Sequence, residues 1–537
     1  MEYETEKSIS DQSNLTTDNK EEVQDQRCTE VLIIIVFFVL ALVSAVAWAM
    51  LITALVEDKG DGLGKHGDDL LSDGTVQSEE PPVEVVAVPR RTPQRDSSTP
   101  SPTTSREVPA TPRTPPPGRT TPPSTTSKIT VRTTASAGPL TAGTTVTTKT
   151  TIIGDRPLNE ALFCTYGTST TANTKFPWDG LCDFIFYDSM YKNGVNTLNQ
   201  TTPYSADMEV VLRQAESGGY TKTQFGLGFS FTSARTLLLR YASGYKSTID
   251  QFLHRGVSHL GIIDCPVYGM APSQINQVFG AISVLSRDLK PLRDRGQAAF
   301  LVVGVISFNN AWNEYFKNQF TVKNEFKPNL FISHGYQLSQ DWVRTPCLTT
   351  PPTVLVKPPH RQQDIHDLHD AMRALREISA AAGAPALLLS VTMKGRWTEL
   401  LANSTAKVFS QCSQKSPRHP SSSYTAVCNT EPFASTLQYD SEGYAMRAYN
   451  AQNHHMFLYD DEQAFCEKLC KARANYTQLW FGVAVFDLEY EDGDNTCSTR
   501  NKAGSFSRLK TVAELLLRFS SHNADWSPEN CCSFWRS

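Results

Sequence analysis

AAFLVVGVISF, residues 298–308, is an apolar run of strand length that stops at two asparagines. Seven further runs along the chain have the length and composition typical of buried strands. They are LFCTY (162–166), DFIFYDS (183–189), QFGLGFSF (224–231), HLGIID (259–264), NLFISHGY (329–336), ALLLSVTM (386–393) and LWFGVAVFDLEY (479–490). Eight such runs predict a domain built around eight strands.

The segments between these runs carry apolar residues at helical spacing. Two examples are RTLLLRYASGYKSTIDQFLHRG (235–256) and HDAMRALREISAAAGAP (369–385), and the second ends in a Gly/Pro helix stop. Strands that alternate with helices predict an α/β fold. Eight such pairs are typical of a parallel TIM (β/α)8 barrel with insertions. An open doubly wound sheet is the alternative, because periodicity does not show whether a sheet closes.

Residues 31–56, VLIIIVFFVLALVSAVAWAMLITALV, contain no charged residue. As a helix of about 1.5 Å per residue they would span roughly 39 Å, enough for a bilayer core of about 30 Å. A cleaved signal peptide is the rival, since Ala45, Ala47 and Ala49 imitate a cleavage site. The run exceeds a signal-peptide core of ~7–15 residues and follows an acidic leader, so we predict a retained transmembrane signal-anchor helix.

Cysteines and sequons orient this anchor, because the Lys and Arg residues near its two ends balance. Only Cys28 precedes the anchor, and the other cysteines all lie beyond residue 160. Asn199, Asn403 and Asn475 begin N-glycosylation sequons in that same part of the chain. Many cysteines in a glycosylatable region indicate an oxidising compartment. We predict a single-pass plasma-membrane protein with a cytoplasmic N-terminus and an extracellular C-terminal domain.

Composition defines the other parts of the chain. Residues 1–30 are polar and acidic and predict a disordered cytoplasmic tail. Residues 57–153 are largely Pro, Thr and Ser, as in SPTTSREVPATPRTPPPGRTTPPSTTS. They predict a disordered, mucin-like stalk, with an unmodified linker as the alternative. Residues 154–537 have a globular composition and contain the eight apolar runs.

Two groups of residues imitate metal sites. His366 and His369 share a helix face near several aspartates, but acids at a helix start also favour the helix dipole. DLEYEDGDN (487–495) imitates a calcium loop without the spacing or distal Glu of an EF-hand. We therefore predict no metal site and no cofactor. The net charge of -5 argues against a nucleic-acid partner.

Several motifs, taken in order, resemble glycoside hydrolase family 18, the chitinases and chitinase-like proteins. LFCTYGTS and GLCDFIFYDS look like that family's first two strands, and GAPALLLSVTMKGRW (383–397) looks like its seventh. Then follow YTAVC (424–428), GYAMRAYN (443–450), FLYDDEQAFCEKL (457–469) and LWFGVAVFDLEYEDGDNTC (479–497). The resemblance covers roughly residues 160–520 and implies a small α+β insertion at about 397–456.

The resemblance also implies where catalytic residues would stand. In that family the fourth strand carries Asp-Gly-x-Asp-x-Asp-x-Glu, whose acids share one strand face and whose Glu donates the proton to the leaving group. Aligning Gly256 with the family's preceding glycine puts Ser258, Gly261 and Ile263 on the acid positions. Cys265 then falls on the general-acid position.

A shift of the alignment does not restore this acid. Moving it by one residue puts Asp264 on an acid position but Pro266 on the glutamate position. No Glu occurs between Glu216 and Glu314. We therefore predict no catalytic residues.

Other pocket positions differ from the family pattern as well. His334-Gly335-Tyr336-Gln337 keeps the tyrosine of the family's sixth-strand Met-Tyr-Asp but replaces the aspartate. Phe486 stands at the eighth-strand tryptophan, and Gly228-Phe229-Ser230 corresponds to Gly-Gly-Trp on the third strand. Because an aromatic face can still stack on a sugar ring, Phe229, Tyr336 and Phe486 are the candidate glycan-pocket residues.

Family members commonly carry two disulfides, which would be Cys164–Cys182 and Cys428–Cys497 here. Seven cysteines of the predicted extracellular domain then remain, and their odd number predicts a free thiol or an intermolecular bridge. The seven are Cys265, Cys347, Cys412, Cys466, Cys470, Cys531 and Cys532. Cys531 and Cys532 lie near the C-terminus and are the candidates for a disulfide-linked homodimer.

These observations favour a membrane-tethered, chitinase-like pseudo-hydrolase that binds a chitin-like glycan or a protein. An active glycoside hydrolase with relocated carboxylates is one alternative. A structural or adhesion protein with no small ligand is another.

Overall fold

A computed structural model describes residues 152–536 except 154–155, 199, 201–202, 235–236, 238–245, 267–271, 307–309, 322–326, 339–342, 359–364, 416 and 522–525. The predicted tail (1–30), the predicted membrane anchor (31–56) and nearly all of the predicted stalk (57–153) lie outside the described residues. Within the described part, no helix is long and apolar enough to cross a bilayer. Strand β1 (Ile152–Ile153) pairs with β2 (Arg156–Pro157), so regular pairing begins two residues before the predicted domain boundary.

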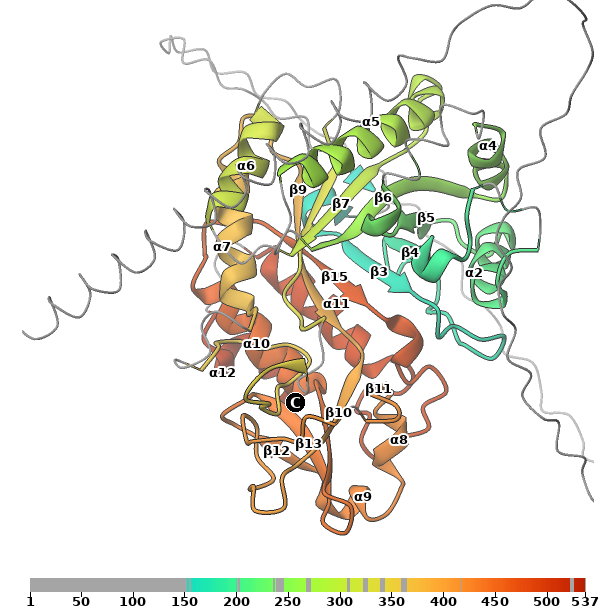
Figure 1. Ribbon diagram of the computed structural model, residues 1–537. Helices are drawn as coiled ribbons and strands as arrows, with labels where there is room; N and C mark the ends of the chain where they lie inside the picture. Colours follow the sequence, from blue (N-terminus) through green and yellow to red (C-terminus); the bar gives the residue numbers. More distant parts are fainter. Residues whose placement is uncertain are drawn as a thin grey trace, which may run out of the picture. The chain divides into compact units, whose positions relative to one another are not determined.

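Eight parallel strands close into a barrel in the order β15-β3-β4-β5-β6-β7-β8-β9 (Figure 1). Each strand lies within or overlaps the apolar run predicted for it, and the closure excludes the open sheet. The strands are β3 (Leu162–Tyr166), β4 (Phe184–Met190), β5 (Gln224–Phe229), β6 (Val257–Pro266), β7 (Leu301–Ile306), β8 (Leu330–Ser333), β9 (Ala386–Thr392) and β15 (Gly482–Phe486).

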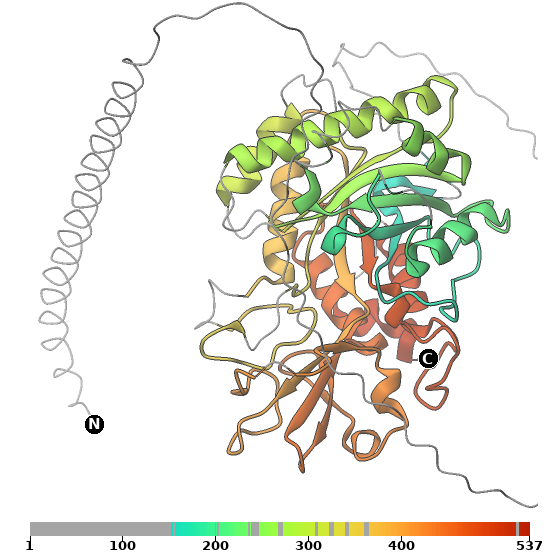
Figure 2. The same cartoon turned by 45° about the vertical axis from the view of Figure 1, so that its right-hand side comes forward.

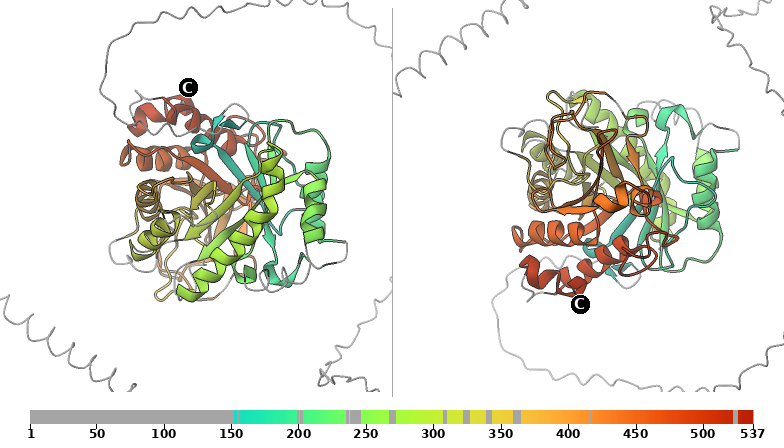
Figure 3. Two further views of the ribbon diagram at one scale, coloured as in Figure 1. Left: turned by 90° about the horizontal axis from the view of Figure 1, so that it is seen from above. Right: turned by 90° about the horizontal axis from the view of Figure 1, so that it is seen from below.

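Helices surround the strands, as the two end views in Figure 3 show. They are α2 (Ala206–Glu216), α4 (Lys246–His254), α5 (Pro272–Asp294), α6 (Asn310–Thr321), α7 (Leu368–Ser379), α10 (Glu462–Ala474) and α11 (Ser507–Phe519). Because alternate strand residues face opposite sides, β7 contributes Leu301, Val303 and Val305 to a core shared with the helices, and Val302 to the core inside the barrel.

A five-stranded antiparallel sheet is inserted between β9 and α10, and it occupies the lower part of Figure 2. Its order is β11-β10-β14-β13-β12. The strands are β10 (Gly395–Glu399), β11 (Ser421–Ser422), β12 (Gln438–Asp440), β13 (Ala445–Asn450) and β14 (His455–Tyr459), with the short helices α8 (Thr425–Cys428) and α9 (Phe433–Thr436) among them. The predicted α+β insertion is therefore present, and its sheet extends two or three residues beyond each expected end.

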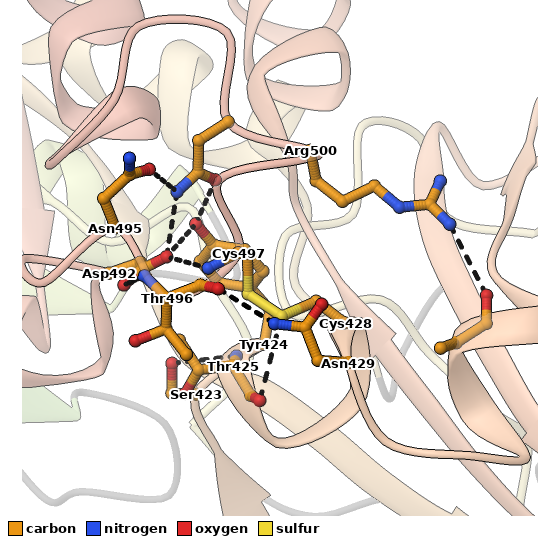
Figure 4. Close-up of a disulfide and its surroundings, with 12 residues drawn as sticks. Ser423, Tyr424, Thr425, Cys428, Asn429, Asp492, Asn495, Thr496, Cys497 and Arg500 are labelled. Carbon is orange, nitrogen blue, oxygen red and sulfur yellow. Dashed lines mark hydrogen bonds between the residues drawn. A yellow bond between two sulfur atoms is a disulfide. The ribbon is translucent and has the colours of Figure 1, made fainter.

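The two predicted disulfides, Cys164–Cys182 and Cys428–Cys497, are both formed. The second joins the insertion to the segment after β15, where Asn429 Nδ2 also donates to the Thr496 carbonyl at 2.8 Å (Figure 4). Asp492 accepts from the backbone N–H groups of Thr496 and Cys497. Its carboxylate therefore shapes a turn of the segment that imitates a calcium loop.

The remaining cysteines correct the prediction of a covalent dimer. Three further bridges form within the chain: Cys347–Cys412, Cys466–Cys532 and Cys470–Cys531. Cys531 is the last residue of α12 (Pro528–Cys531), and Cys532 follows it. Because both form disulfides within the chain, neither is available to bridge to a second chain. The odd thiol is Cys265, which is buried.

Candidate functional site

A cavity of about 360 Å³ lies at the C-terminal ends of the barrel strands, where barrel enzymes and binding proteins place their sites. Residues of both the barrel and the inserted sheet form its walls. The lining residues are Asp188, Lys192, Phe231, Thr232, Ile263, Asp264, Tyr336, Gln337, Leu338, Pro352, Thr392, Lys394, Arg396, Ser421, Phe486 and Asp487.

Two of the three predicted pocket aromatics line this cavity. The rings of Tyr336 and Phe486 lie 5.2 Å apart, and His334 packs 4.9 Å from Phe486. Phe229 does not line it. On β5, Phe229 points to the core between strands and helices and packs near Tyr191, because the glycine positions of that strand face the barrel interior.

The fourth barrel strand, β6, contains a bulge that decides which side chain enters the cavity. Ile262 pairs with Val303 and Cys265 with Val305, so three steps along β6 match two along β7. Regular alternation from Gly261 and Ile263 would have turned Cys265 inward. The extra residue reverses this alternation: Cys265 joins the core beneath the helices, and Asp264 lines the cavity.

Contacts from neighbouring strands fit this bulge. His334, which follows β8, hydrogen-bonds through Nε2 to the Ile263 carbonyl at 2.6 Å. Gly304 on β7 faces the same carbonyl, and a Cβ there would lie 2.2 Å from its oxygen. Only glycine therefore permits this close approach of β6 to β7.

The other positions aligned with the family's acids carry no acid into the cavity. Ile263 lines the cavity as part of the inner core. A Cβ on Gly261 would collide with the Val302 backbone, and the Ser258 hydroxyl lies 3.1 Å from His259 Nε2. Burial raises the pKa of the Cys265 thiol well above its usual range, so this thiol does not ionise near neutral pH.

Asp264 is held in place by the turn that follows β5. Its Oδ1 accepts from the backbone N–H of Phe231 at 2.7 Å, at the start of the 3₁₀ turn Phe231–Ser233. Burial raises the pKa of Asp264 to about 6, and the charge of Asp188 adds to this shift. At pH 7 the carboxyl group is therefore mostly ionised.

Asp188 lies near the C-terminal end of β4 and lines the cavity. Its two oxygens accept from Thr165 Oγ1 at 3.0 Å and Ser189 Oγ at 2.6 Å. Burial raises the pKa of Asp188 as well.

Asp487, directly after β15, is paired with a cation. Lys394 Nζ lies 2.5 Å from its Oδ1, and Thr392 Oγ1 donates to its Oδ2 at 2.6 Å. Asp487 adopts the left-handed conformation (φ 62°), which non-glycine residues rarely occupy and which marks sites under constraint.

Glu489 lies behind these aspartates and is not among the lining residues. Its Oε2 accepts from the Gly167 backbone N–H at 3.1 Å. Burial, with the charges of Asp487 and Asp188, raises the pKa of Glu489 to about 8. It is therefore mostly protonated at neutral pH.

The two histidines that imitate a metal site, His366 and His369, do not line the cavity. His366 is buried and bonds to the His334 carbonyl, whereas His369 contacts Asn475, so these two histidines do not converge. In the described part of the chain, the one cluster with metal-ligand spacing is Cys466, Cys470 and Cys532, whose sulfurs are in disulfides. Of the sequons, Asn403 and Asn475 are exposed and Asn199 lies outside the described residues.

The prediction from sequence missed the charged residues Asp188, Lys394 and Asp487. Lys394 directly follows an apolar run, Asp487 directly follows β15, and Asp188 lies near the end of β4, so all three are at the C-terminal end of a parallel strand. That position was the available signal, because functional side chains of a barrel gather at this edge.

No family model matches the chain, and no curated protein matches it. Solved structures do resemble it. A Trichuris suis chitinase aligns at 15% identity with a TM-score of 0.48, over 66% of this chain and 99% of that one. Ostrinia furnacalis Group IV chitinase, in complex with allosamidin, aligns at 14% and 0.47, over 67% and 100%. YKL-39, solved in the presence of chitooligosaccharides, aligns at 13% and 0.48, over 66% and 99%. Similarities at this level assign no activity or ligand to the chain.

Proposed function

We propose that this chain is a membrane-tethered, chitinase-like surface protein that binds an oligosaccharide at the mouth of its barrel without hydrolysing it. The apolar segment 31–56 supports the tether, and the Pro/Thr-rich stalk after it would hold the domain away from the membrane. In this arrangement the domain serves recognition at the plasma membrane.

The cavity carries this proposal. Tyr336 and Phe486 offer apolar ring surface on which a sugar ring can stack, and charged side chains around them offer partners for hydroxyl groups. A site with an aromatic surface and converging polar groups, at the C-terminal end of a barrel, suits a polar ring compound better than an extended protein surface.

The charge state of the carboxyl groups argues against hydrolysis near neutral pH. A glycosidase needs a carboxylic acid that can protonate the leaving oxygen. The described lining contains aspartates and no glutamate, and Asp264 is mostly ionised at pH 7. Asp487 is paired with Lys394, and the protonated Glu489 is not among the lining residues.

The test uses the full chain, produced in a eukaryotic secretory system and held in detergent micelles. Calorimetry at pH 6.5 with β-1,4-linked tetramers of N-acetylglucosamine and of glucosamine should detect binding of at least one of them. Phe486→Leu should weaken binding about tenfold, because it removes the stacking face. The matched control is Phe481→Leu, which changes a buried phenylalanine outside the cavity.

Two results would contradict the proposal. If the unmodified protein binds neither tetramer nor any member of a wider glycan panel, a structural protein without a small ligand is favoured. If sugars are released within hours at neutral pH, the protein is an enzyme.

A hydrolase that uses Asp264 is the second candidate, because the bulge of β6 directs this carboxyl group into the cavity and its pKa is about 6. Such an enzyme would work only when Asp264 is protonated. Sugar release should then rise as the pH falls through 6 and disappear in Asp264→Asn. Chromatography of tetramer digests between pH 4.5 and 7.5 distinguishes the two functions.

A further inference from the structure

Some of the charged groups around the cavity form ion pairs, and others do not. The groups that line it are Asp188, Lys192, Asp264, Lys394, Arg396 and Asp487. Asp487 has its cation, since Lys394 lies 2.5 Å away. Asp188 on β4 and Asp264 on β6 have no ion-pair partner within 4 Å among the described residues.

These two carboxylates accept hydrogen bonds from neutral donors. Asp188 accepts from two hydroxyl groups, and Asp264 accepts from a backbone N–H. Each oxygen can accept more than one hydrogen bond, so capacity remains on both groups.

One strand, β5, which contains no charged residue, separates the strands that carry the two carboxylates. Gly228 lies on β5, between the strands that carry Asp188 and Asp264. A Cβ on Gly228 would lie 2.8 Å from the Ile263 side chain and 3.2 Å from the Asp188 Cα. The Ile263 side chain approaches this glycine, and β5 itself places no charged side chain between the two acids.

Lys192 also lines the cavity and forms no ion pair among the described residues, but it does not neutralise the two aspartates. It lies in an exposed 3₁₀ turn after β4 (Lys192–Gly194) and lowers the pKa of both aspartates only partly. Ionising two carboxyl groups that burial disfavours in the charged form is costly, and a cationic ligand would offset this cost.

We propose that the ligand carries a protonated amine that lies between Asp188 and Asp264, so the site prefers sugars with a free amino group to their N-acetylated forms. This inference rests on the proposed function and names the class of sugar. The amine would donate charge-assisted hydrogen bonds to both carboxylates while the ring stacks on Phe486 or Tyr336.

The test compares β-1,4-linked tetramers of glucosamine and of N-acetylglucosamine by calorimetry on the full chain in micelles at pH 6.5. At this pH Asp264 is mostly ionised and much of the amine is protonated. The amine tetramer should bind about tenfold tighter or more, as expected when a charge pair is gained in a partly enclosed site. Asp188→Asn and Asp264→Asn should each reduce this preference to about threefold or less, with little change for the acetylated tetramer.

Asp494→Asn is the matched control, because Asp494 is exposed, pairs with Lys175 at 3.4 Å and lies outside the cavity. It should leave the preference unchanged. Thermal melting of each variant shows whether it is folded. The comparison of the two tetramers on the unmodified protein needs no variant.

Each of the other possible outcomes contradicts the inference, and one of them also contradicts the proposed function. If the acetylated tetramer binds as tightly as the amine or tighter, the inference is overturned while the proposed function stands. If the preference persists in both cavity variants, the amine lies elsewhere and the inference also fails. If neither tetramer nor any other sugar binds, the proposed function fails, and the inference with it.

Discussion

Two of the regions that contain buried charges, the barrel mouth and a junction around Arg508, differ in how those charges are paired. At the junction, Arg508 and Glu491 form an ion pair at 2.7 Å, with both side chains 1% exposed or less. Arg508 also lies 4.4 Å from the Tyr424 ring and donates to carbonyls of Met393, Asp460 and Tyr490.

At the mouth, by contrast, Asp188 and Asp264 line a cavity and, among the described residues, accept hydrogen bonds from neutral donors without forming an ion pair. The junction contacts connect the end of β9, the start of α10, the segment after β15 and the insertion, so its charges hold the architecture together. The mouth charges contact only neighbouring strand ends, and in the function that we propose they bind a ligand. Removing a charge from the junction should therefore lower the free energy of unfolding, whereas removing a charge from the mouth should raise it.

Arg508→Met should give the largest effect. The methionine roughly fills the space but leaves Glu491 and the carbonyls of the junction without their donor. Removing one partner of a buried pair costs about 3–5 kcal/mol of unfolding free energy, measured by urea denaturation. Arg518→Met is the control, since Arg518 pairs with Glu514 on an exposed helix face and should cost less than about 1 kcal/mol. Equal losses of unfolding free energy in the two variants would mean that the buried Arg508 contacts contribute no more stability than an exposed ion pair.

Removing the disulfide that ties the insertion to the segment after β15 should come next. Cys428→Ala with Cys497→Ala opens a bridge between residues 69 positions apart. The expected loss is about 2–4 kcal/mol, chiefly because the unfolded chain gains freedom. Cys265→Ala, which removes a buried but unbridged sulfur, should cost about 1 kcal/mol by the same denaturation measurement. A double variant no less stable than this control would contradict a structural role for the bridge.

The difference between the regions also explains what the sequence could and could not predict. The strands were predictable because their apolar runs are local, and β3 has the predicted bounds. The outward turn of Cys265 was not predictable, because the bulge of β6 meets His334 and Gly304, which are far from it in the chain. Phe229 was misplaced for a simpler reason, since its strand alternates apolar residues with glycines and only the glycine side faces inward.

The cysteines show the same limit. Two bridges followed from the family resemblance, but Cys466 and Cys470 each had several partners that the sequence allowed. Their bonds to Cys532 and Cys531 depend on how α12 packs on α10, which is a tertiary fact.

At the mouth, Asp264→Asn should stabilise the protein at neutral pH. The folded-state pKa of Asp264, about 6, lies above the unfolded value near 3.8. The folded state therefore binds more protons between these values, and stability falls as the pH rises through this window. Replacing the charge should add about 1 kcal/mol of unfolding free energy at pH 7.5, after allowance for partial exposure, and almost nothing at pH 4. Urea denaturation at both pH values checks this, with the exposed Asp494→Asn as a control that should show no pH-dependent gain. A loss of stability at pH 7.5 would place Asp264 with the structural charges of the junction.

Tyr336→Phe should have the smallest effect on stability and still weaken ligand binding. The Tyr336 ring is buried beside Phe486, and its hydroxyl group has no hydrogen-bond partner within the described residues. Phenylalanine keeps the ring contacts, so the unfolding free energy should change by less than about 0.5 kcal/mol. Affinity for the preferred tetramer should nevertheless fall about threefold to tenfold if the hydroxyl group bonds to a sugar, because one hydrogen bond contributes about 0.5–1.5 kcal/mol. Denaturation and calorimetry on the same preparation separate the two quantities. A variant that loses stability but keeps its affinity would show that Tyr336 stabilises the barrel and does not bind the ligand. Tyr336 would then resemble the residues of the junction rather than those proposed to bind sugar at the mouth.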